Sequence, residues 1–232
     1  MSRRIRLLSL VDGAKKATGL TVVIDVLRAF SLEAYLYSQG AKEIVPVMTV
    51  EEAFDIKRSD PEVILVGERG GVKCEGFDFG NSPSQLRDAD VKNRKIIHTT
   101  SAGTRGLLSV SGETELLTAA FVNARAVAEY IDRSGADDVS IVAMGLAGKR
   151  KTDEDELCAR YIKGILEHDE IPDIDKKLKK LKYTDGSKFF KAINQKVFPE
   201  EDFWMSTKRD IFDFVIKVEK EGSKLTTKKI DI

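Results

Sequence analysis

The stretch Leu20-Thr21-Val22-Val23-Ile24-Asp25-Val26 decides the fold class of this chain. It is a short apolar run, rich in β-branched residues, with a single acid near its end. A run of this kind is typical of a strand that is buried on both faces of a sheet. We therefore predict a fully buried strand here, with Asp25 at its carboxyl end.

Comparable runs follow along the chain and alternate with amphipathic segments. The predicted strands cover residues 43–47, 63–66, 95–99, 115–118 and 139–143. The predicted helices cover residues 28–39, 51–58, 123–132 and 154–167, and a further helix begins at 104. A repeated β-α-β order predicts a mostly parallel sheet with helices on both faces. The expected fold class is therefore α/β, with three layers in the order α/β/α.

The last third of the chain has a different character. Residues 176–182 are dense in charge and indicate a solvated helix or loop, and the apolar residues within 189–198 favour one more helix packed on the body. The alternating segment 212–218, a Glu-Gly turn signal and the segment 225–230 predict a C-terminal hairpin.

Length and composition bound the class of protein. The chain has 232 residues, which favours a single domain over 1–232. Lys+Arg and Asp+Glu are both 38, so the basic excess typical of nucleic-acid binders is absent. The 2 cysteines form no disulfide scaffold, and no apolar run suits a signal peptide or a membrane span. We expect a cytoplasmic protein that binds neither nucleic acid nor membrane; the sequence leaves a homo-oligomer open.

Polar residues gather at the predicted strand ends. Asp25 and Arg28 follow the first buried run, and Glu68 and Arg69 follow another. In an open α/β sheet, ligands bind outside the carboxyl ends of the strands. A structural salt bridge is the alternative for each acid–arginine pair, but the recurrence of such pairs favours a site for a small polyanion.

A third strand end carries several hydroxyl groups in one turn, within TTSAGTR (99–105). Gly103 permits a tight backbone, the following helix favours an anion, and Arg105 offers a planar fork for phosphate or sulfonate oxygens. The alternative is a helix cap with a surface arginine. The predicted substrate-binding residues are Arg28, Arg69, Thr99, Thr100, Ser101, Gly103, Thr104 and Arg105.

Carboxylates near the strand ends suggest a metal. Asp25, Glu68 and Asp78 can supply oxygen ligands to Mg²⁺, which takes one or two carboxylates, keeps waters and bridges to phosphate. Asp78 lies in a Gly-rich loop over 70–83, which allows a small hairpin and in which Ser82-Pro83 resembles a helix start. The predicted metal ligands are Asp25, Glu68 and Asp78, and the predicted catalytic residues are Asp25, Arg28, Glu68 and Arg69.

Other candidates have simpler explanations. His98 lies on an apolar strand, where a core histidine is more common than an acid or base. Cys74 lacks the surroundings of a nucleophile, and Cys158 fits a helix core. Glu154 and Asp155 suit the first turn of a helix, where acids favour the helix dipole.

Five strings, in order, carry a family resemblance. They are VVIDVLRA (22–29), VGERGGVKCEGFDFGNSP (66–83), TTSAGTRGL (99–107), FVNARAVAEY (121–130) and TDEDELCA (152–159). Together they resemble the 2-phosphosulfolactate phosphatase family over about residues 20–165. Phe30 and Ala102 depart from the family pattern, in which a small hydroxyl residue and an Asn are expected.

The resemblance implies Mg²⁺-dependent hydrolysis of 2-phospho-3-sulfolactate to 3-sulfolactate and phosphate, a step on a route to coenzyme M. It implies an α/β/α fold, and it raises the chance that Glu154 or Asp155 faces the site. Such a substrate carries phosphate, sulfonate and carboxylate, which explains several cations beside a metal. Two alternatives remain: a phosphatase of another small phosphorylated carboxylic acid, and a non-catalytic module that binds such an acid.

Overall fold

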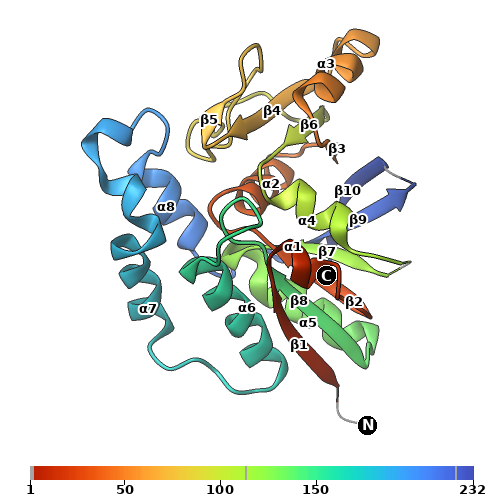
Figure 1. Ribbon diagram of the computed structural model, residues 1–232, viewed down its shortest axis with the longest axis vertical. Coiled ribbons are helices and arrows are strands. Elements are labelled where there is room, and N and C mark those ends of the chain that lie inside the picture. The colour runs from red at the N-terminus through yellow and green to blue at the C-terminus, as the bar shows by residue number, and fades with distance from the viewer. Residues whose placement is uncertain (1–2, 113, 223) are drawn as a thin grey trace.

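The computed structural model describes residues 3–112, 114–222 and 224–232, and its centre is a ten-stranded sheet (Figure 1). The strands are β1 (Arg4–Ser9), β2 (Leu20–Ile24), β3 (Glu43–Pro46), β4 (Ile64–Arg69), β5 (Val72–Lys73), β6 (Lys95–Thr99), β7 (Leu116–Ala119), β8 (Asp138–Ala143), β9 (Phe214–Glu221) and β10 (Lys224–Asp231). Their order across the sheet is β1-β8-β2-β7-β9-β10-β3-β6-β4-β5.

The α-helices connect the strands or follow them. They are α1 (Leu10–Ala14), α2 (Ala29–Ser38), α3 (Val50–Ser59), α4 (Gly103–Ser109), α5 (Ala124–Ser134), α6 (Asp153–Leu166), α7 (Ile174–Lys180) and α8 (Glu200–Thr207). Short 3₁₀ turns are η1 (Phe121–Asn123), η2 (Leu181–Tyr183), η3 (Asp185–Phe190) and η4 (Ala192–Asn194).

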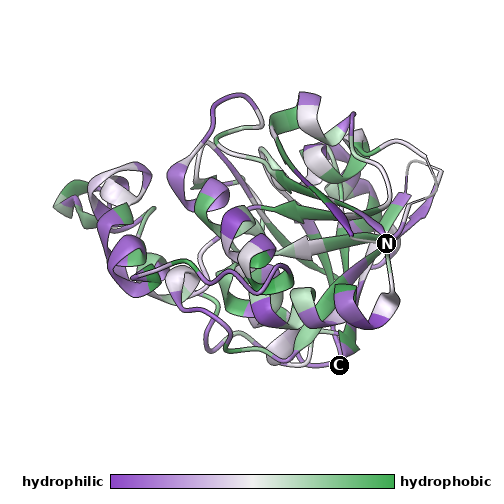
Figure 2. Cartoon of the chain, turned by 90° about the horizontal axis from the view of Figure 1, so that it is seen from below, coloured by the Kyte–Doolittle hydropathy of each residue, from purple (hydrophilic) through white to green (hydrophobic). Residues whose placement is uncertain are grey.

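The side chains of each buried strand alternate between two apolar layers. In β2, Val22 and Ile24 join the core beneath α2, α5 and α6, whereas Val23 joins a second cluster beneath α1 and α4. In β4, Leu65 packs in a third cluster with Ala53 of α3. Figure 2 shows hydrophobic residues concentrated on the strands and hydrophilic residues on the outer faces of the helices. The predicted α/β/α layers are confirmed.

The C-terminal hairpin is also confirmed, and it occupies the middle of the sheet. β9 pairs antiparallel with β7, and β10 pairs antiparallel with β9 and with β3. Two parallel groups, β1-β8-β2-β7 and β3-β6-β4, therefore flank an antiparallel pair. Sequence periodicity identifies a hairpin but not its partners, because those contacts are remote along the chain.

The carboxyl ends of the two parallel groups face one space, although the antiparallel hairpin lies between the groups. Six strand-to-strand steps separate β2 from β4. At the usual twist of roughly 20–25° per step, they accumulate about 120–150° of rotation. A rotation of this size would offset most of the reversal that the antiparallel hairpin introduces. The carboxyl ends of β2, β4, β6 and β8 border one cavity.

Several predicted elements differ from the observed ones. The N-terminal strand β1 was not predicted, because its arginines interrupt the apolar pattern. No helix starts at Ser82-Pro83, where the chain forms consecutive turns. The apolar segment 189–198 forms 3₁₀ turns instead of one helix, and α8 follows it unpredicted. The small hairpin in the loop over 70–83 is present as β4 and β5.

Candidate active site

A cavity of about 530 Å³ opens where the carboxyl ends of the strands face the chain from Arg150 to Phe198. We call its two sides the strand-end wall and the helical wall. The strand-end wall comprises Asp25, Leu27, Arg28, Glu68, Gly70, Gly71, Asn81, Ser101, Ala102, Gly145, Leu146 and Ala147. The helical wall comprises Arg150, Thr152, Glu154, Asp155, Asp185, Lys188 and Phe198.

Glu68 is held in a fixed orientation at the end of β4. One carboxylate oxygen accepts a hydrogen bond from the Gly71 N–H at 2.6 Å, and the other accepts one from the Ser101 N–H at 2.8 Å. Gly71 has a φ of +86°, and a Cβ there would lie 2.2 Å from the Phe198 ring. Glycine is therefore required for the turn that holds Glu68.

Asp25 lies buried beyond the end of β2, where its Oδ1 accepts a hydrogen bond from the Ala29 N–H at 3.2 Å. Burial raises the pKa of Asp25 to about 6; the Ala29 hydrogen bond opposes this rise, and the charge of Glu68 adds to it. The two predicted acids, Asp25 and Glu68, therefore lie close enough to repel each other. A cation between them would relieve that repulsion.

The first turn of α6 adds two buried acids. Asp155 accepts hydrogen bonds from the Val26 N–H and the Gly145 N–H, both at 2.8 Å, and so joins the ends of β2 and β8. Burial raises its pKa well above the ordinary value, and the charges of Glu154 and Asp25 add to this. Burial also raises the pKa of Glu154 to about 7, and its Oε2 is buried without a partner in the described residues.

Lys188 of η3 supplies a cation that sequence analysis missed. Its Nζ lies over the rings of Phe189 and Phe198, at 5.5 and 5.1 Å from their centroids, and forms no ion pair or hydrogen bond within the described residues. Burial lowers the pKa of Lys188, although the charge of Glu154 opposes that shift. The aromatic residues around it suggested an ordinary packed helix, so no sequence signal separated this lysine from its neighbours.

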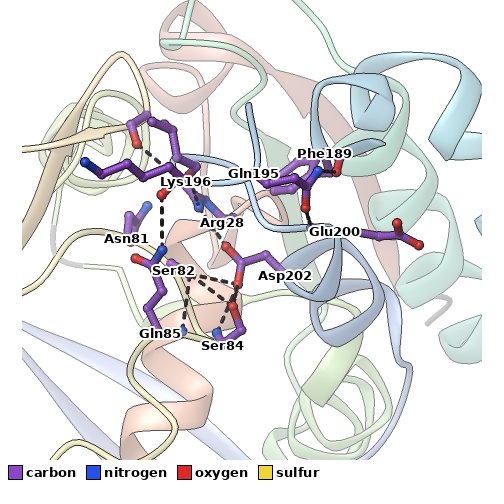
Figure 3. A network of polar contacts seen from close by, with 12 residues as sticks. Arg28, Asn81, Ser82, Ser84, Gln85, Phe189, Gln195, Lys196, Glu200 and Asp202 are labelled. Atoms are coloured by element: carbon purple, nitrogen blue, oxygen red, sulfur yellow. Dashed lines mark hydrogen bonds and ion pairs between the residues drawn. The ribbon is translucent and has the colours of Figure 1, made fainter. Parts of the chain in front are cut away.

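Arg28 lies in the strand-end wall, but its guanidinium is already engaged (Figure 3). Nη1 donates to Asp202 at 2.7 Å, and both side chains are buried. Its other hydrogen bonds reach the carbonyls of Val197 and Gly71, and Phe198 packs against the guanidinium at 4.9 Å. The salt-bridge alternative therefore applies to Arg28, with Asp202 of α8 as the partner instead of Asp25.

Arg69 and Asp78 do not line the cavity. Arg69 donates to the Met48 carbonyl and to Thr99 Oγ1, at 3.0 and 2.9 Å. Asp78 is exposed and accepts a hydrogen bond from the Leu65 N–H at 2.8 Å. Asp78 therefore fixes its loop against β4, away from Asp25 and Glu68.

The predicted hydroxyl turn borders a second, smaller hollow of about 240 Å³, which we call the basic hollow. It is lined by Met48, Arg69, Thr100, Ser101, Arg105, Ala147 and Lys149. Ser101 and Ala147 also line the main cavity, so the two spaces adjoin. Thr100 Oγ1 accepts from the Thr104 N–H at 3.2 Å, as the capping alternative predicts. Arg105 and Lys149 are exposed, and Gly103 packs against Phe30.

Comparison with known proteins identifies the family. The family profile described as 2-phosphosulpholactate phosphatase matches residues 8–221. A protein of Bacillus subtilis (strain 168), named probable 2-phosphosulfolactate phosphatase, is 34% identical over 92% of this chain and 92% of its own length. Proteins with the same name from Caldicellulosiruptor saccharolyticus and Clostridium acetobutylicum are 43% and 40% identical, over 60% and 72% of this chain and 59% and 67% of their own lengths. The chain belongs to the 2-phosphosulfolactate phosphatase family.

Two departures from the pattern of the 2-phosphosulfolactate phosphatase family have different consequences. Phe30 is buried in the core beneath α1 and α4 and does not line the cavity. Its ring lies 3.0 Å from where a Gly103 Cβ would stand, so the large side chain fills space that glycine leaves. Ala102 does line the cavity, where it presents a methyl group instead of an amide.

The acids of this family member fit a magnesium ion only in part. No group of three His, Cys, Asp or Glu side chains within the described residues is arranged to hold a metal. Mg²⁺ needs only one or two carboxylates when water and phosphate complete its shell. Asp25 Oδ2 has no hydrogen-bond partner in the described residues, and Glu68 lies beside it. This donor set suits an open magnesium site, but not the predicted set that includes Asp78.

The remaining candidates lie away from the cavity. Cys74 and Cys158 are free and buried, and neither lines the cavity.

None of the helices in the described ranges is both long and apolar enough to cross a bilayer.

Proposed function

We propose that this protein is a Mg²⁺-dependent phosphomonoesterase that hydrolyses 2-phospho-3-sulfolactate to 3-sulfolactate and phosphate. The observation that carries the proposal is the cavity itself. Buried acids with raised pKa values face Lys188, a cation without a counterion in the described residues. Buried, mutually repelling acids are costly for stability and are found where chemistry needs them.

The substrate would be held by cations in two adjoining places. Lys188 would bind an oxygen of the phosphate in the main cavity, and Arg150 would assist after release from Asp185, its partner at 2.6 Å. Arg105 and Lys149 would bind the sulfonate in the basic hollow. Because Ser101 and Ala147 line both spaces, one substrate would contact both of them.

Asp25 and Glu68 would hold the magnesium ion. When bound, the ion would act as a Lewis acid that offsets negative charge on the phosphate. The hydrogen bonds from Gly71 and Ser101 would keep the Glu68 carboxylate in one orientation, and the Ala29 hydrogen bond would do the same for Asp25. Fixed orientation reduces the reorganisation needed at the moment of reaction.

Glu154 would act as the general acid that protonates the leaving oxygen. With a pKa raised to about 7, its carboxyl group is partly protonated at neutral pH. As the bond between phosphorus and the ester oxygen breaks, it would give that proton to the leaving oxygen. Water would form the new bond to phosphorus, one of its protons would stay on phosphate, and the other would pass through solvent and restore the Glu154 carboxyl group. A group whose pKa is near the working pH is well suited to such a transfer.

The alternatives fit these observations less well. A non-catalytic module would need the basic hollow and Lys188, but it would not need Asp25, Glu154 and Asp155 to be buried together. A phosphatase for another phosphorylated acid would need the main cavity without Arg105 and Lys149.

The direct test is phosphate release from 2-phospho-3-sulfolactate by the purified protein, with Mg²⁺ and after EDTA treatment. We expect turnover that EDTA abolishes and Mg²⁺ restores. Full turnover in excess EDTA would exclude the magnesium mechanism. Absence of phosphate release at every metal condition would exclude 2-phospho-3-sulfolactate as the substrate.

A further inference from the structure

A buried hydrogen-bond network of Glu33, His98 and Asn81 lies directly behind the strand-end wall. His98, near the end of β6, contacts Glu33 of α2 through Nδ1 at 3.0 Å. Its Nε2 contacts Asn81 Oδ1 at 3.1 Å. The exposed fraction is 1% for His98 and Glu33 and 5% for Asn81. Asn81 also lines the main cavity, so the network runs from the core to the site.

The protons on the imidazole are tied to the orientation of the Asn81 amide. A carboxylate oxygen accepts hydrogen bonds, and so does an amide oxygen. With Oδ1 of Asn81 toward the ring, both ring nitrogens would donate, and the Glu33 carboxylate would be the counterion of an imidazolium. The reversed amide would instead donate to a bare Nε2 and turn Oδ1 to the cavity.

The Asn81 amide lies with its Oδ1 toward His98, whereas its Nδ2 has no hydrogen-bond partner within the described residues. A ring that carries hydrogen on both nitrogens would keep this orientation, because it can only donate. The Asn81 NH₂ group is therefore the end that remains available to the cavity.

The backbone beside Asn81 is held by a separate set of contacts. Ser82 Oγ and the Ser84 N–H both donate to Asp202 Oδ1, at 2.9 and 3.0 Å, and Asp202 also pairs with Arg28 (Figure 3). The loop therefore does not need His98 to hold its position. The contact between His98 and Asn81 acts on the side-chain amide.

The network of Glu33, His98 and Asn81 also lowers the stability of the fold if its role is purely structural. Glu33 Oε2 is buried with no partner in the described residues, and an unsatisfied buried carboxylate oxygen costs stability. Replacing a buried ion pair with apolar groups of similar volume is often neutral or stabilising. Because the network ends at the cavity, it is better explained by the NH₂ group that Asn81 directs toward the cavity.

We propose that Asn81 contacts the substrate through its NH₂ group, which donates to an anionic oxygen, and that Glu33 and His98 are positioning residues that fix this orientation. The inference rests on the proposed function for the identity of the anion. It adds a neutral donor to the cations already described, and it explains why an amide stands at this point of the cavity.

The first test reads the protonation of His98 without any substrate. The chain has only 2 histidines, so in protein with ¹⁵N-labelled histidine the exposed His168 is the single other signal. His168→Gln removes it and serves as the matched control. We expect both His98 nitrogens to carry hydrogen in this background, and Glu33→Gln to remove one of them. A neutral ring with one bare nitrogen would overturn the positioning argument.

The second test reads the role of Asn81 by kinetics. Asn81→Ala should lower kcat/KM for the phosphorylated substrate by about tenfold or more, the usual effect of losing a hydrogen bond to a charged group. Asn81→Asp keeps the acceptor for His98 but replaces the donor with a negative oxygen, and should lower it further. Glu33→Gln should reduce kcat/KM although it touches no substrate. Folded variants with unchanged kcat/KM would overturn the proposal.

The third measurement separates failure of this inference from failure of the proposed function. Inorganic phosphate and 3-sulfolactate are titrated into wild-type protein and Asn81→Ala in the presence of Mg²⁺. If the wild type releases no phosphate from 2-phospho-3-sulfolactate, the proposed function fails. The inference about Asn81 would still hold if at least one of the two anions binds about tenfold more weakly to Asn81→Ala than to the wild type. If the wild type and Asn81→Ala have equal affinities for each anion, the role of Asn81 is wrong, whatever the outcome for the proposed function.

Discussion

The two walls of the cavity differ in how their polar groups are engaged. On the strand-end wall, both oxygens of Glu68 accept backbone hydrogen bonds, and Arg28 is bound to Asp202 and two carbonyls. On the helical wall, Lys188 Nζ has no ion pair and Glu154 Oε2 has no hydrogen bond within the described residues. The strand-end wall therefore engages its cation, Arg28, within the fold, whereas the helical wall holds a cation, Lys188, that can take a new partner. Asp155 on the helical wall differs from Lys188, because both of its oxygens accept backbone hydrogen bonds.

This difference changes where anion binding is expected. The arginines at the strand ends were the obvious candidates, because planar guanidinium groups suit phosphate. The Arg28 charge is already neutralised by buried Asp202, and three of its N–H groups donate to Asp202 and two carbonyls, so it offers a phosphate less than an unpaired cation does. The cation available to a phosphate is therefore Lys188, and the strand-end wall contributes fixed acids. Four changes to the chain sharpen or break this comparison.

The largest effect is expected for Asp25→Asn on the strand-end wall. Loss of a metal-binding charge should reduce kcat by about a hundredfold or more, because even weaker changes around metal ligands cost 10–100-fold. The fold should survive, since Asn can still accept the Ala29 hydrogen bond and Arg28 pairs elsewhere. The measurements are kcat and a melting curve. An unchanged kcat would remove Asp25 from the site.

On the helical wall, Lys188→Met keeps much of the side-chain volume and removes the charge. We expect kcat/KM to fall by roughly tenfold to 150-fold, the range for one charge-assisted hydrogen bond of about 1.5–3 kcal/mol. Lys191→Met, an exposed lysine of the same segment, is the matched control and should change little. Equal behaviour of the two variants would mean that the helical wall binds no phosphate.

A smaller and more selective effect is expected in the basic hollow. Arg105→Lys should reduce kcat/KM for 2-phospho-3-sulfolactate by about tenfold, because Lys lacks the bidentate fork. It should have less effect on phospholactate, which has no sulfonate. Both substrates are measured at one salt concentration. Equal losses for both would show that Arg105 does not bind the sulfonate.

The smallest effect concerns stability and its dependence on pH. The folded pKa of Glu154 is about 7 against an ordinary 4.5, so the metal-free fold binds its proton more tightly than the unfolded chain. Stability should therefore fall as pH rises from about 4.5 to 7. Glu154→Gln cannot ionise, so it should be more stable than wild type at pH 8, by up to roughly 3 kcal/mol in the free energy of unfolding.

The same variant should match the wild type near pH 4, where both side chains are neutral. Thermal melts of both proteins across this range, in EDTA, give the comparison. If Glu154→Gln is less stable at pH 8, the carboxylate is compensated in the fold and its role as a proton donor is wrong.

The sequence predicted one wall of the cavity much better than the other. Buried strands can be recognised from their apolar runs, so Asp25 and Glu68 were predicted at strand ends, and the structure brings these two ends to one cavity. Lys188 and Asp202 lie in segments without clear periodicity, and they reach the site only through contacts remote along the chain. Spacing alone could not show that Arg28 would pair with Asp202, or that Asp78 would turn toward Leu65.

The hairpin illustrates the same limit at the level of the fold. Alternation in 212–218 and 225–230 was enough to predict two paired strands. Their insertion between β7 and β3 depends on the complete sheet, and it sets the direction of the strands that carry Glu68 relative to those that carry Asp25.

The most direct test of the account is a crystal structure with Mg²⁺ and 3-sulfolactate bound. We predict the ion on Asp25 and Glu68, the product beside Lys188 on the helical wall, and its sulfonate in the hollow with Arg105. A product bound only by Arg28 and Arg69, with Lys188 and Arg105 unengaged, would contradict the division of roles between the two walls.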